Sequence, residues 1–247
     1  MNKFDHVSAS LARLAAERED ARLRDRFGHV TTWVFDLDNT LYPSNSGIWD
    51  KIDERITLFL IELFGLDGQS ARALHQYYYL RHGTTLRGLI EDDIHEAERF
   101  LEFVHDIDRS ALQPDPALAS EVARLPGRKL IFTNGSRNHA ILTARQLGLD
   151  GLFEDAFDIV AARLTPKPAE AAYEAFFSQF DIDPRRAAMF EDMPKNLAVP
   201  KAKGMTTVLV AHSRLPLESA SGVADFVTDD LGGFLKRINF QFGLEAG

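Results

Sequence analysis

The sequence of 247 residues contains no cysteine, which excludes disulfide bonds and cysteine-ligated zinc sites. It also lacks any apolar run that approaches the roughly 20 residues needed by a membrane-spanning helix. The first 20 residues hold four acidic side chains and no uninterrupted apolar stretch, which argues against a secretory signal or an organellar transit peptide. These absences predict a cytoplasmic protein that has no membrane partner.

Positive charge is also in short supply, because 28 Lys and Arg residues face 37 Asp and Glu residues, for a formal net charge of −9. Such a chain disfavours a nucleic-acid polymer as its main partner, although it leaves room for a small anionic ligand in a local positive pocket. The hydrophobic content of 45% is enough to bury a substantial core. The length allows one large domain, or one domain with a smaller insertion, and composition leaves the oligomeric state open.

Short apolar runs typical of buried strands recur along the chain, and most of them alternate with helical patterns. This alternation predicts an α/β fold in which a parallel sheet is covered by helices on both faces. The expected strands are 31–37, 129–133, 157–161, 187–190, 206–210 and 225–227. The clearest helices between them are expected at 138–147 and 169–180.

The segment between the first two strands contains no convincing strand. It instead shows four helical patterns, at 48–64, 69–81, 86–92 and 94–104. A segment this long and helical is neither a crossover nor a loop, so it predicts a helical cap domain inserted over the carboxyl ends of the strands. The expected domains are an N-terminal amphipathic helix (1–28), an α/β core (29–43 and 126–240) and the cap (44–125). The N-terminal helix could cover an edge of the core or contact a second subunit.

Acidic residues lie at the ends of two of the expected strands. Asp36 and Asp38 lie at the end of the first strand, and Glu191 and Asp192 at the end of the fourth. Parallel strands end at one edge of a sheet, so these side chains should meet. Two carboxylates about 6 Å apart repel each other by roughly 3 kcal/mol at an effective dielectric constant of about 20. A divalent cation would offset this repulsion, and a set of oxygen donors favours Mg²⁺.

The groups that follow the other strands suit a phosphate. Thr133 offers a hydroxyl group, and the amides of Asn134 and Gly135 lie in a strand-to-helix turn, near the positive end of a helix. Lys167 stands between two prolines and supplies a cation. These residues predict that a phosphoryl group binds beside the carboxylates.

The two aspartates after the first strand suggest the chemistry. Asp36 could attack phosphorus as a nucleophile, and Asp38 could protonate the leaving oxygen and later deprotonate water. Each motif alone also has a structural explanation, such as an Asx turn after the strand or an acidic cap of the next helix. Their joint occurrence at four strand ends in this order favours phosphoryl transfer.

The motifs that carry this chemistry resemble those of the haloacid dehalogenase superfamily of phosphatases. They are DLDNT (36–40), IFTNG (131–135), Lys167 and the acidic pair 191–192. Within the superfamily, DLDNTLYP, the segment GTTLRGL (83–89), FTNGS and FEDMPKNL resemble the pyrimidine 5′-nucleotidase group, over residues 30–238. Met193 departs from the pattern, because many relatives carry a small or hydroxyl residue there.

The resemblance implies a Rossmann-like core with a helical cap, and it implies Mg²⁺ as cofactor. Asp36 would be both nucleophile and metal ligand. Asp38 would supply its backbone carbonyl group to the metal and its side chain as the acid and base. Asp192 would ligate the metal directly, and Glu191 either directly or through water.

The same resemblance implies that Thr133 and Lys167 bind the transferring phosphoryl group. The second acid, Asp38, argues against a true dehalogenase, which does not need it. The expected substrate is a small phosphorylated molecule, with pyrimidine nucleoside 5′-monophosphates favoured. A phosphatase or mutase for sugar phosphates is the alternative within enzymes, and a regulatory module that binds a phosphorylated metabolite is the alternative outside them.

Further substrate contacts are expected outside the four motifs. Arg87, Thr85 and Asn196 are candidate substrate contacts, although Arg87 could instead pair with Glu91 one turn further on. Within the run of tyrosines at 77–79, at least one side chain should pack inside and another should be exposed. The aromatic residues Trp49, Phe59 and Phe64 are expected in the core, and four histidines are expected to be structural or on the surface: His75, His82, His95 and His105.

Overall fold

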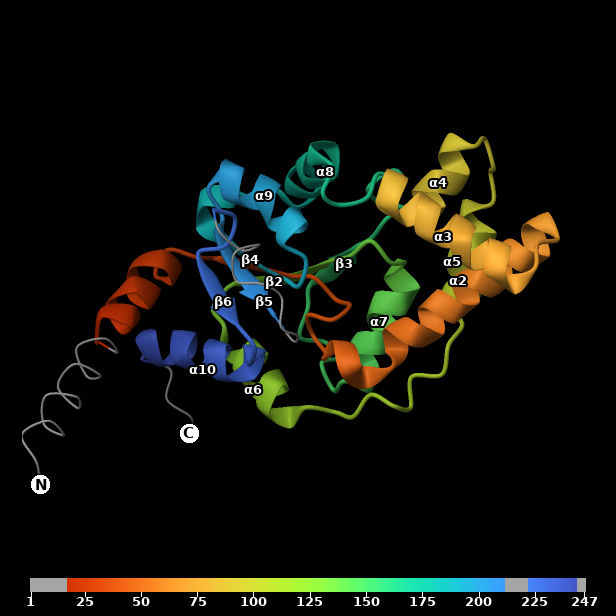
Figure 1. The fold of residues 1–247 in the computed structure, drawn as a ribbon. Coiled ribbons are helices and arrows are strands. Elements are labelled where there is room, and N and C mark those ends of the chain that lie inside the picture. Colours follow the sequence, from red (N-terminus) through yellow and green to blue (C-terminus); the bar gives the residue numbers. More distant parts are fainter. Residues whose placement is uncertain (1–16, 212–221, 244–247) are drawn as a thin grey trace, which may run out of the picture.

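The computed structural model describes residues 17–211 and 222–243, and it shows a central sheet with helices on both faces (Figure 1). All neighbouring strands are parallel. Their order across the sheet is β3-β2-β1-β4-β5-β6. The predicted α/β class is therefore confirmed. The strands are β1 (Thr32–Phe35), β2 (Arg128–Phe132), β3 (Asp155–Phe157), β4 (Ala187–Glu191), β5 (Thr206–Val210) and β6 (Phe226–Thr228).

The third strand differs most from its prediction. It was expected at 157–161 but ends at Phe157. The reason lies in the next residue, because the carboxylate of Asp158 accepts hydrogen bonds from the backbone N–H groups of Arg137 and Ala161, each at 2.8 Å. These bonds fold the chain into a turn where an extended strand was predicted.

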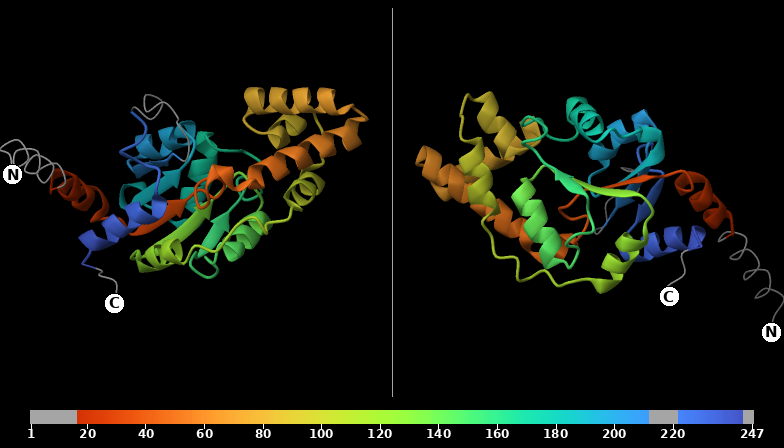
Figure 2. Two further views of the ribbon diagram at one scale, coloured as in Figure 1. Left: turned by 60° about the horizontal axis from the view of Figure 1, so that its bottom comes forward. Right: turned by 180° about the vertical axis from the view of Figure 1, so that it is seen from behind.

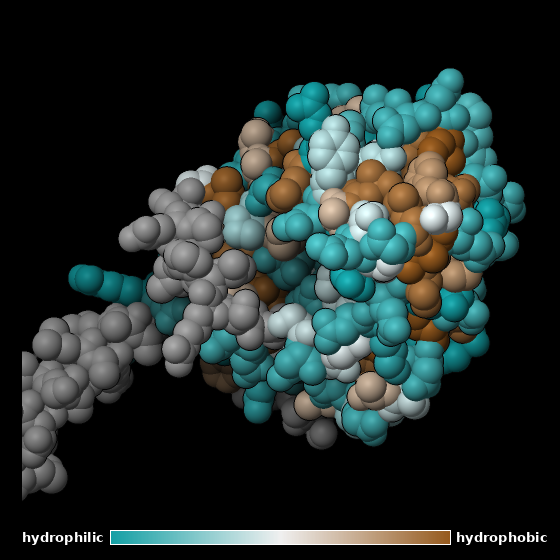
Figure 3. Space-filling model, turned by 45° about the vertical axis from the view of Figure 1, so that its right-hand side comes forward, coloured by the Kyte–Doolittle hydropathy of each residue, from teal (hydrophilic) through white to brown (hydrophobic). Residues whose placement is uncertain are grey.

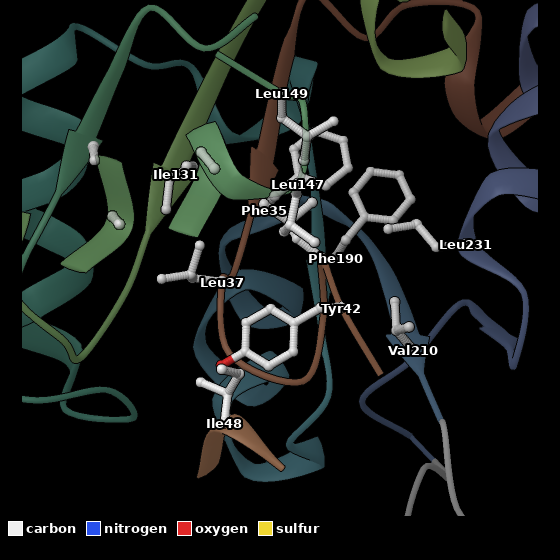
Figure 4. Close-up of a cluster of buried hydrophobic side chains, with 14 of the residues drawn as sticks. Phe35, Leu37, Tyr42, Ile48, Ile131, Leu147, Leu149, Phe190, Val210 and Leu231 are labelled. Atoms are coloured by element: carbon white, nitrogen blue, oxygen red, sulfur yellow. The ribbon is translucent and has the colours of Figure 1, made fainter. Parts of the chain in front are cut away.

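Successive side chains of each strand enter different cores. On β1, Phe35 faces one core and stacks on Phe190 of β4, with ring centroids 4.6 Å apart, as Figure 4 shows for the surrounding cluster. The preceding residue, Val34, faces a second core together with Met189. Full burial of a side chain of this size stabilises the fold by about 1.5–3 kcal/mol. Both faces of the sheet are therefore covered by packed side chains.

Within residues 17–211 and 222–243, five helices cover the two faces of the sheet. α8 and α9 cover one face, and α6, α7 and α10 cover the other, which comes forward in the left panel of Figure 2. α9 continues past the buried Pro200, which lies in its second half. These helices are α6 (Pro116–Arg124), α7 (Arg137–Gln146), α8 (Glu170–Phe180), α9 (Pro194–Lys203) and α10 (Leu231–Gln241).

Four more helices of the described part of the chain, here called the helical unit, stand beyond the strand ends (Figure 1). Within the unit, α3 contacts both α2 and α4, and α5 contacts α2. Polar side chains cap two of its helices, because Asp67 accepts from the backbone N–H groups at the start of α3, and Thr84 does so for α4. Its helices are α2 (Ile48–Phe64), α3 (Gly68–His82), α4 (Thr85–Glu91) and α5 (Ala97–His105).

The helix α6 lies inside the range predicted for the cap, yet it packs on the core. It contacts α10, and Asn239 of α10 donates hydrogen bonds to both the backbone oxygen and the side chain of Glu121. Sequence reasoning missed this helix altogether. We therefore propose that the helical unit ends before Pro116, earlier than the predicted boundary at 125.

The predicted N-terminal helix falls partly outside the described residues, since residues 1–16 are not among them. Residues 17–27 are helical. Their carboxyl-terminal end is fixed to the core, because Leu23 and Phe27 are fully buried and Arg26 pairs with Asp225 at 2.6 Å. This segment thus covers an edge of the core and is more than a surface helix.

Figure 3 shows the face that includes the helical unit, on which hydrophobic and hydrophilic side chains lie close together. Leu58, Phe64 and Leu80 are among the large hydrophobic residues exposed on α2 and α3. Phe64 had been predicted in the core, and this prediction is wrong. Phe59, by contrast, is completely buried as predicted.

Candidate active site

The acidic residues predicted from the sequence meet at the carboxyl-terminal edge of the sheet. Asp36 follows β1 directly, and its backbone N–H donates to the oxygen of Phe190 on β4 at 2.9 Å. Because β1 and β4 are neighbours, this bond brings Asp36 beside Glu191 and Asp192. One oxygen from each of these three side chains lies within 4.8 Å of the others.

This acidic cluster is crowded and shielded from water. Burial raises the pKa of Asp36 to about 7, and the charge of Glu191 adds to the effect while Lys167 opposes it. Burial likewise raises the pKa of Asp192 to about 9, with Glu191 and Asp36 adding to it. Burial contributes most to both shifts, and repulsion among the three carboxylates adds to it. A hard divalent cation fits this place, because every donor is a carboxylate oxygen.

Lys167 is a buried cation beside the acidic cluster. Only 2% of the residue is exposed, and its Nζ lies 2.7 Å from both Asp36 Oδ1 and Glu191 Oε2 and donates to the oxygen of Phe132 at 2.8 Å. Burial disfavours its charged form, but the two carboxylates outweigh burial and raise the pKa of Lys167. The ammonium group is therefore permanently charged and fixed in position.

The turn after β2 holds this lysine in place. The side chain of Asn134 accepts from the backbone N–H of Lys167 at 2.8 Å and donates to its backbone oxygen at 3.2 Å. The N–H of Gly135 donates to the hydroxyl oxygen of Thr133 at 2.9 Å. Thr133 and Asn134 line the cavity described below. The amide of Gly135, predicted to bind phosphate, is instead engaged by Thr133.

Asp38 is held by two residues that sequence reasoning missed. His139 Nε2 lies 2.8 Å from Asp38 Oδ1, and the hydroxyl group of Tyr42 donates to the same oxygen at 2.5 Å. Burial alone would raise the pKa of Asp38, but His139 and these hydrogen bonds outweigh it and hold the pKa below its ordinary value. The sequence carried one signal for His139, since it lies in the first turn of the helix that follows the FTNGS turn.

A cavity of about 530 Å³ opens between this edge of the sheet and the helical unit. Asn196 is the one predicted substrate contact among its lining residues, and its Nδ2 donates to Glu191 Oε1 at 3.1 Å. Arg87 lies outside the lining and pairs with Glu91, and Thr85 is buried away from it. The helical unit lines the cavity with Trp49, Asp53, Arg72, His75, Gln76, Tyr79, Gly83 and Thr84.

Several aromatic and histidine predictions are corrected by this cavity. Trp49 was expected in the core, but it is 40% exposed and lines the cavity. His75 was expected to have only a structural or surface role, but it also lines the cavity, 3.4 Å from Asp53. In the tyrosine run, Tyr78 is buried and Tyr77 is exposed, as predicted. Which residues of the helical unit face the cavity depends on how the unit packs against the core. Local sequence patterns do not predict that packing.

The chain belongs to the haloacid dehalogenase-like hydrolase family, whose profile matches residues 30–202. A curated relative, Phosphate metabolism protein 8 of Saccharomyces cerevisiae, is 30% identical over 133 residues. This match covers 49% of the chain and 41% of the relative, so it spans less than half of that protein. The family makes the chain a hydrolase that carries the predicted superfamily motifs.

Solved structures support the same fold. A HAD phosphatase from Thermococcus onnurineus matches with a TM-score of 0.59 and 17% identity, over 87% of this chain and 99% of that one. An L-2-haloacid dehalogenase from Xanthobacter autotrophicus, with chloropropionic acid covalently bound, matches with a TM-score of 0.52 and 18% identity, over 84% and 97%. Phosphatases and dehalogenases thus share this fold, and the site must distinguish them.

No helix in the described ranges is long and apolar enough to cross a membrane.

Proposed function

We propose that the protein is a Mg²⁺-dependent phosphomonoester hydrolase that works through an aspartyl-phosphate on Asp36. The observation that carries this proposal is the meeting of Asp36 with Lys167, Glu191 and Asp192, with Asp38 on the same cavity. A nucleophile, a fixed cation, a metal-binding cluster and a second acid are the parts that phosphoryl transfer requires. The second acid favours this chemistry over dehalogenation, in which no leaving oxygen needs a proton.

The residues divide the reaction into two displacements. In the first, an oxygen of Asp36 forms a bond to phosphorus, the bond from phosphorus to the alcohol oxygen breaks, and Asp38 gives that oxygen a proton. In the second, Asp38 takes a proton from water as the water oxygen attacks phosphorus and the bond to Asp36 breaks. Lys167 stabilises the negative charge on the phosphoryl oxygens throughout.

The acidic cluster would hold Mg²⁺ through Asp36, Asp192 and Glu191, the last directly or through water. The bound ion supplies positive charge that screens the phosphoryl group from the surrounding carboxylates. The raised pKa values of Asp36 and Asp192 support this assignment, because a cation at that place relieves the repulsion that contributes to them.

The proposed substrates are pyrimidine nucleoside 5′-monophosphates. The cavity supports this class because it combines a charged end at the sheet with exposed aromatic rings, Trp49 and Tyr79, at the helical unit. A planar base can stack on such rings, and Arg72 and Gln76 can donate hydrogen bonds to its carbonyl groups. The name of the yeast relative agrees with a role in phosphate chemistry.

Phosphate release is the test of the proposed function. Uridine and cytidine 5′-monophosphate, ribose 5-phosphate and 2-chloropropionate are compared as substrates, first with Mg²⁺ and then with excess chelator. We expect fastest release from the two nucleotides, loss of activity with chelator and no chloride from 2-chloropropionate. Faster release from ribose 5-phosphate would favour the sugar-phosphate alternative. Phosphate binding without any release would favour a regulatory module.

Tyr79 should contribute to nucleotide binding through base stacking. Because stacking of a base on an aromatic ring is worth about 1–3 kcal/mol, Tyr79→Ala is expected to raise the KM for uridine 5′-monophosphate about tenfold. The KM for ribose 5-phosphate should stay unchanged, since it has no base. The matched control is Tyr77→Ala, which removes a neighbouring tyrosine that is 55% exposed and outside the cavity lining. Equal changes in KM for both substrates would rule out stacking.

Mg²⁺ should stabilise the fold, and more so as the pH rises. The pKa values of Asp36 and Asp192 in the metal-free protein are raised to about 7 and about 9, from 3.8. The stability from their protonated forms is full below pH 3.8 and is lost as the pH rises through these values. The rise in melting temperature caused by Mg²⁺ should therefore grow between about pH 6 and 9. Asp192→Asn should reduce that rise, and an unchanged rise would argue against the assigned site.

A further inference from the structure

Behind Asp38 lies a chain of polar contacts that the proposed reaction has not used. His139 is completely buried and stacks on His105, with ring centroids 4.4 Å apart and an interplanar angle of 16°. One ring nitrogen, Nε2, reaches Asp38 at 2.8 Å, and the other, Nδ1, lies 2.9 Å from a nitrogen of Arg109. The imidazole therefore bridges a guanidinium group and the proposed acid.

The partner on Nδ1 decides which nitrogen of His139 carries the proton. A guanidinium group has only donors, so Arg109 must donate and Nδ1 must accept. The ring proton is then on Nε2, from where it is donated to Asp38. Arg109 is itself anchored by bonds to the backbone oxygens of His105 and Ile107. With Nδ1 occupied in this way, Nε2 is the nitrogen that donates to Asp38.

The contacts to Asp38 also separate its two oxygens. Within the described ranges, the hydrogen bonds to this side chain, from His139 and Tyr42, both end on Oδ1. Asp38 lines the cavity, so Oδ2 is the oxygen left to exchange a proton there.

We propose that His139 is a positioning residue for the proton transfer by Asp38, with its tautomer set by Arg109. It holds Oδ1 so that Oδ2 delivers the proton to the leaving alcohol oxygen and later takes one from water. This inference rests on the proposed phosphatase function. It predicts that loss of His139 lowers kcat/KM more when the leaving group needs a proton than when it does not.

The test compares two leaving groups in His139→Phe, which keeps a ring and removes the donor. General acid catalysis contributes about 10²- to 10⁴-fold, so kcat/KM for uridine 5′-monophosphate should fall by about 10²-fold or more. With p-nitrophenyl phosphate, whose phenolate leaves without a proton, kcat/KM should fall severalfold at most. This parameter covers only the steps up to release of the alcohol, so the later hydrolysis does not blur the comparison. His139→Gln, which restores an N–H donor, should recover part of the loss.

Two further variants make the outcome decisive. Asp38→Asn should show the same selective loss, and adding His139→Phe to it should cost no further selectivity. If His139→Phe does not fold, Arg109→Met carries the test, with a selective loss of the same direction expected. Equal losses on both substrates would overturn the role of His139. Absence of hydrolysis of every phosphomonoester by the wild-type protein would instead overturn the proposed function.

Discussion

Replacing Asp36 by Asn is expected to lower phosphate release by at least about 10³-fold, because loss of a covalent nucleophile removes the pathway and not merely one interaction. The fold should persist. Asn has nearly the same shape, and Lys167 keeps Glu191 as a partner at 2.7 Å. The melting temperature of the metal-free variant should be unchanged or higher, since one of three crowded carboxylates is gone. Phosphate release and a thermal melt of the same preparation measure both effects.

The control for this variant is Asp229→Asn, which makes the same chemical change at an exposed position far from the site in sequence. It should keep wild-type turnover. Trapping a phosphorylated protein by acid quench should succeed with the wild type and fail with Asp36→Asn. Substantial turnover by Asp36→Asn would refute the aspartyl-phosphate mechanism, even if Mg²⁺ dependence remained.

Replacing Lys167 by Met should damage both stability and activity. The ammonium group is buried and bonded to two carboxylates, so its removal leaves Asp36 and Glu191 uncompensated. Breaking a buried pair by deleting one partner costs about 3–5 kcal/mol. We expect a loss of this size in the free energy of unfolding, measured by urea denaturation without metal, and a fall in turnover of about 10²-fold or more with Mg²⁺.

A double variant separates charge from packing in this result. If uncompensated charge causes the instability, Asp36→Asn should restore part of the stability that Lys167→Met loses. Lys129→Met is the matched control, since in the described part of the chain this lysine bonds backbone oxygens at Leu125 and Gly127 and lies outside the site. If the double variant changes the free energy of unfolding by the sum of the two single changes, lost packing and not uncompensated charge explains the effect.

The site residues that the sequence predicts are those that belong to short contiguous motifs. Asp36, Thr133 and Glu191 each stand at or next to the end of an apolar strand, and parallel strands end at one edge. Once the sheet was predicted, their meeting followed from topology alone. Lys167 was found in the same way, although its two carboxylate partners could be assigned only from coordinates.

The parts that were missed depend on packing between distant segments. His139 and Asp38 are far apart in sequence. The sequence pattern around a buried histidine does not show whether its ring bonds to a site residue or only packs in the core. Trp49 and His75 were misassigned because burial on a helix was judged without knowing which face meets the core. The missed helix α6 did carry a local signal, since Asp115 caps it and Pro116 opens it.

Among the strands of the described residues, β1 comes first in the sequence, yet it lies in the middle of the sheet, between β2 and β4. While the helical unit is being synthesised, both edges of β1 lack their partners, and an unpaired edge invites association with other chains. Only after β4 is made can Asp36 meet Glu191 and Asp192. In chains that stall before that point, Asp36 therefore lacks both acidic neighbours, and the candidate active site is completed only late in translation.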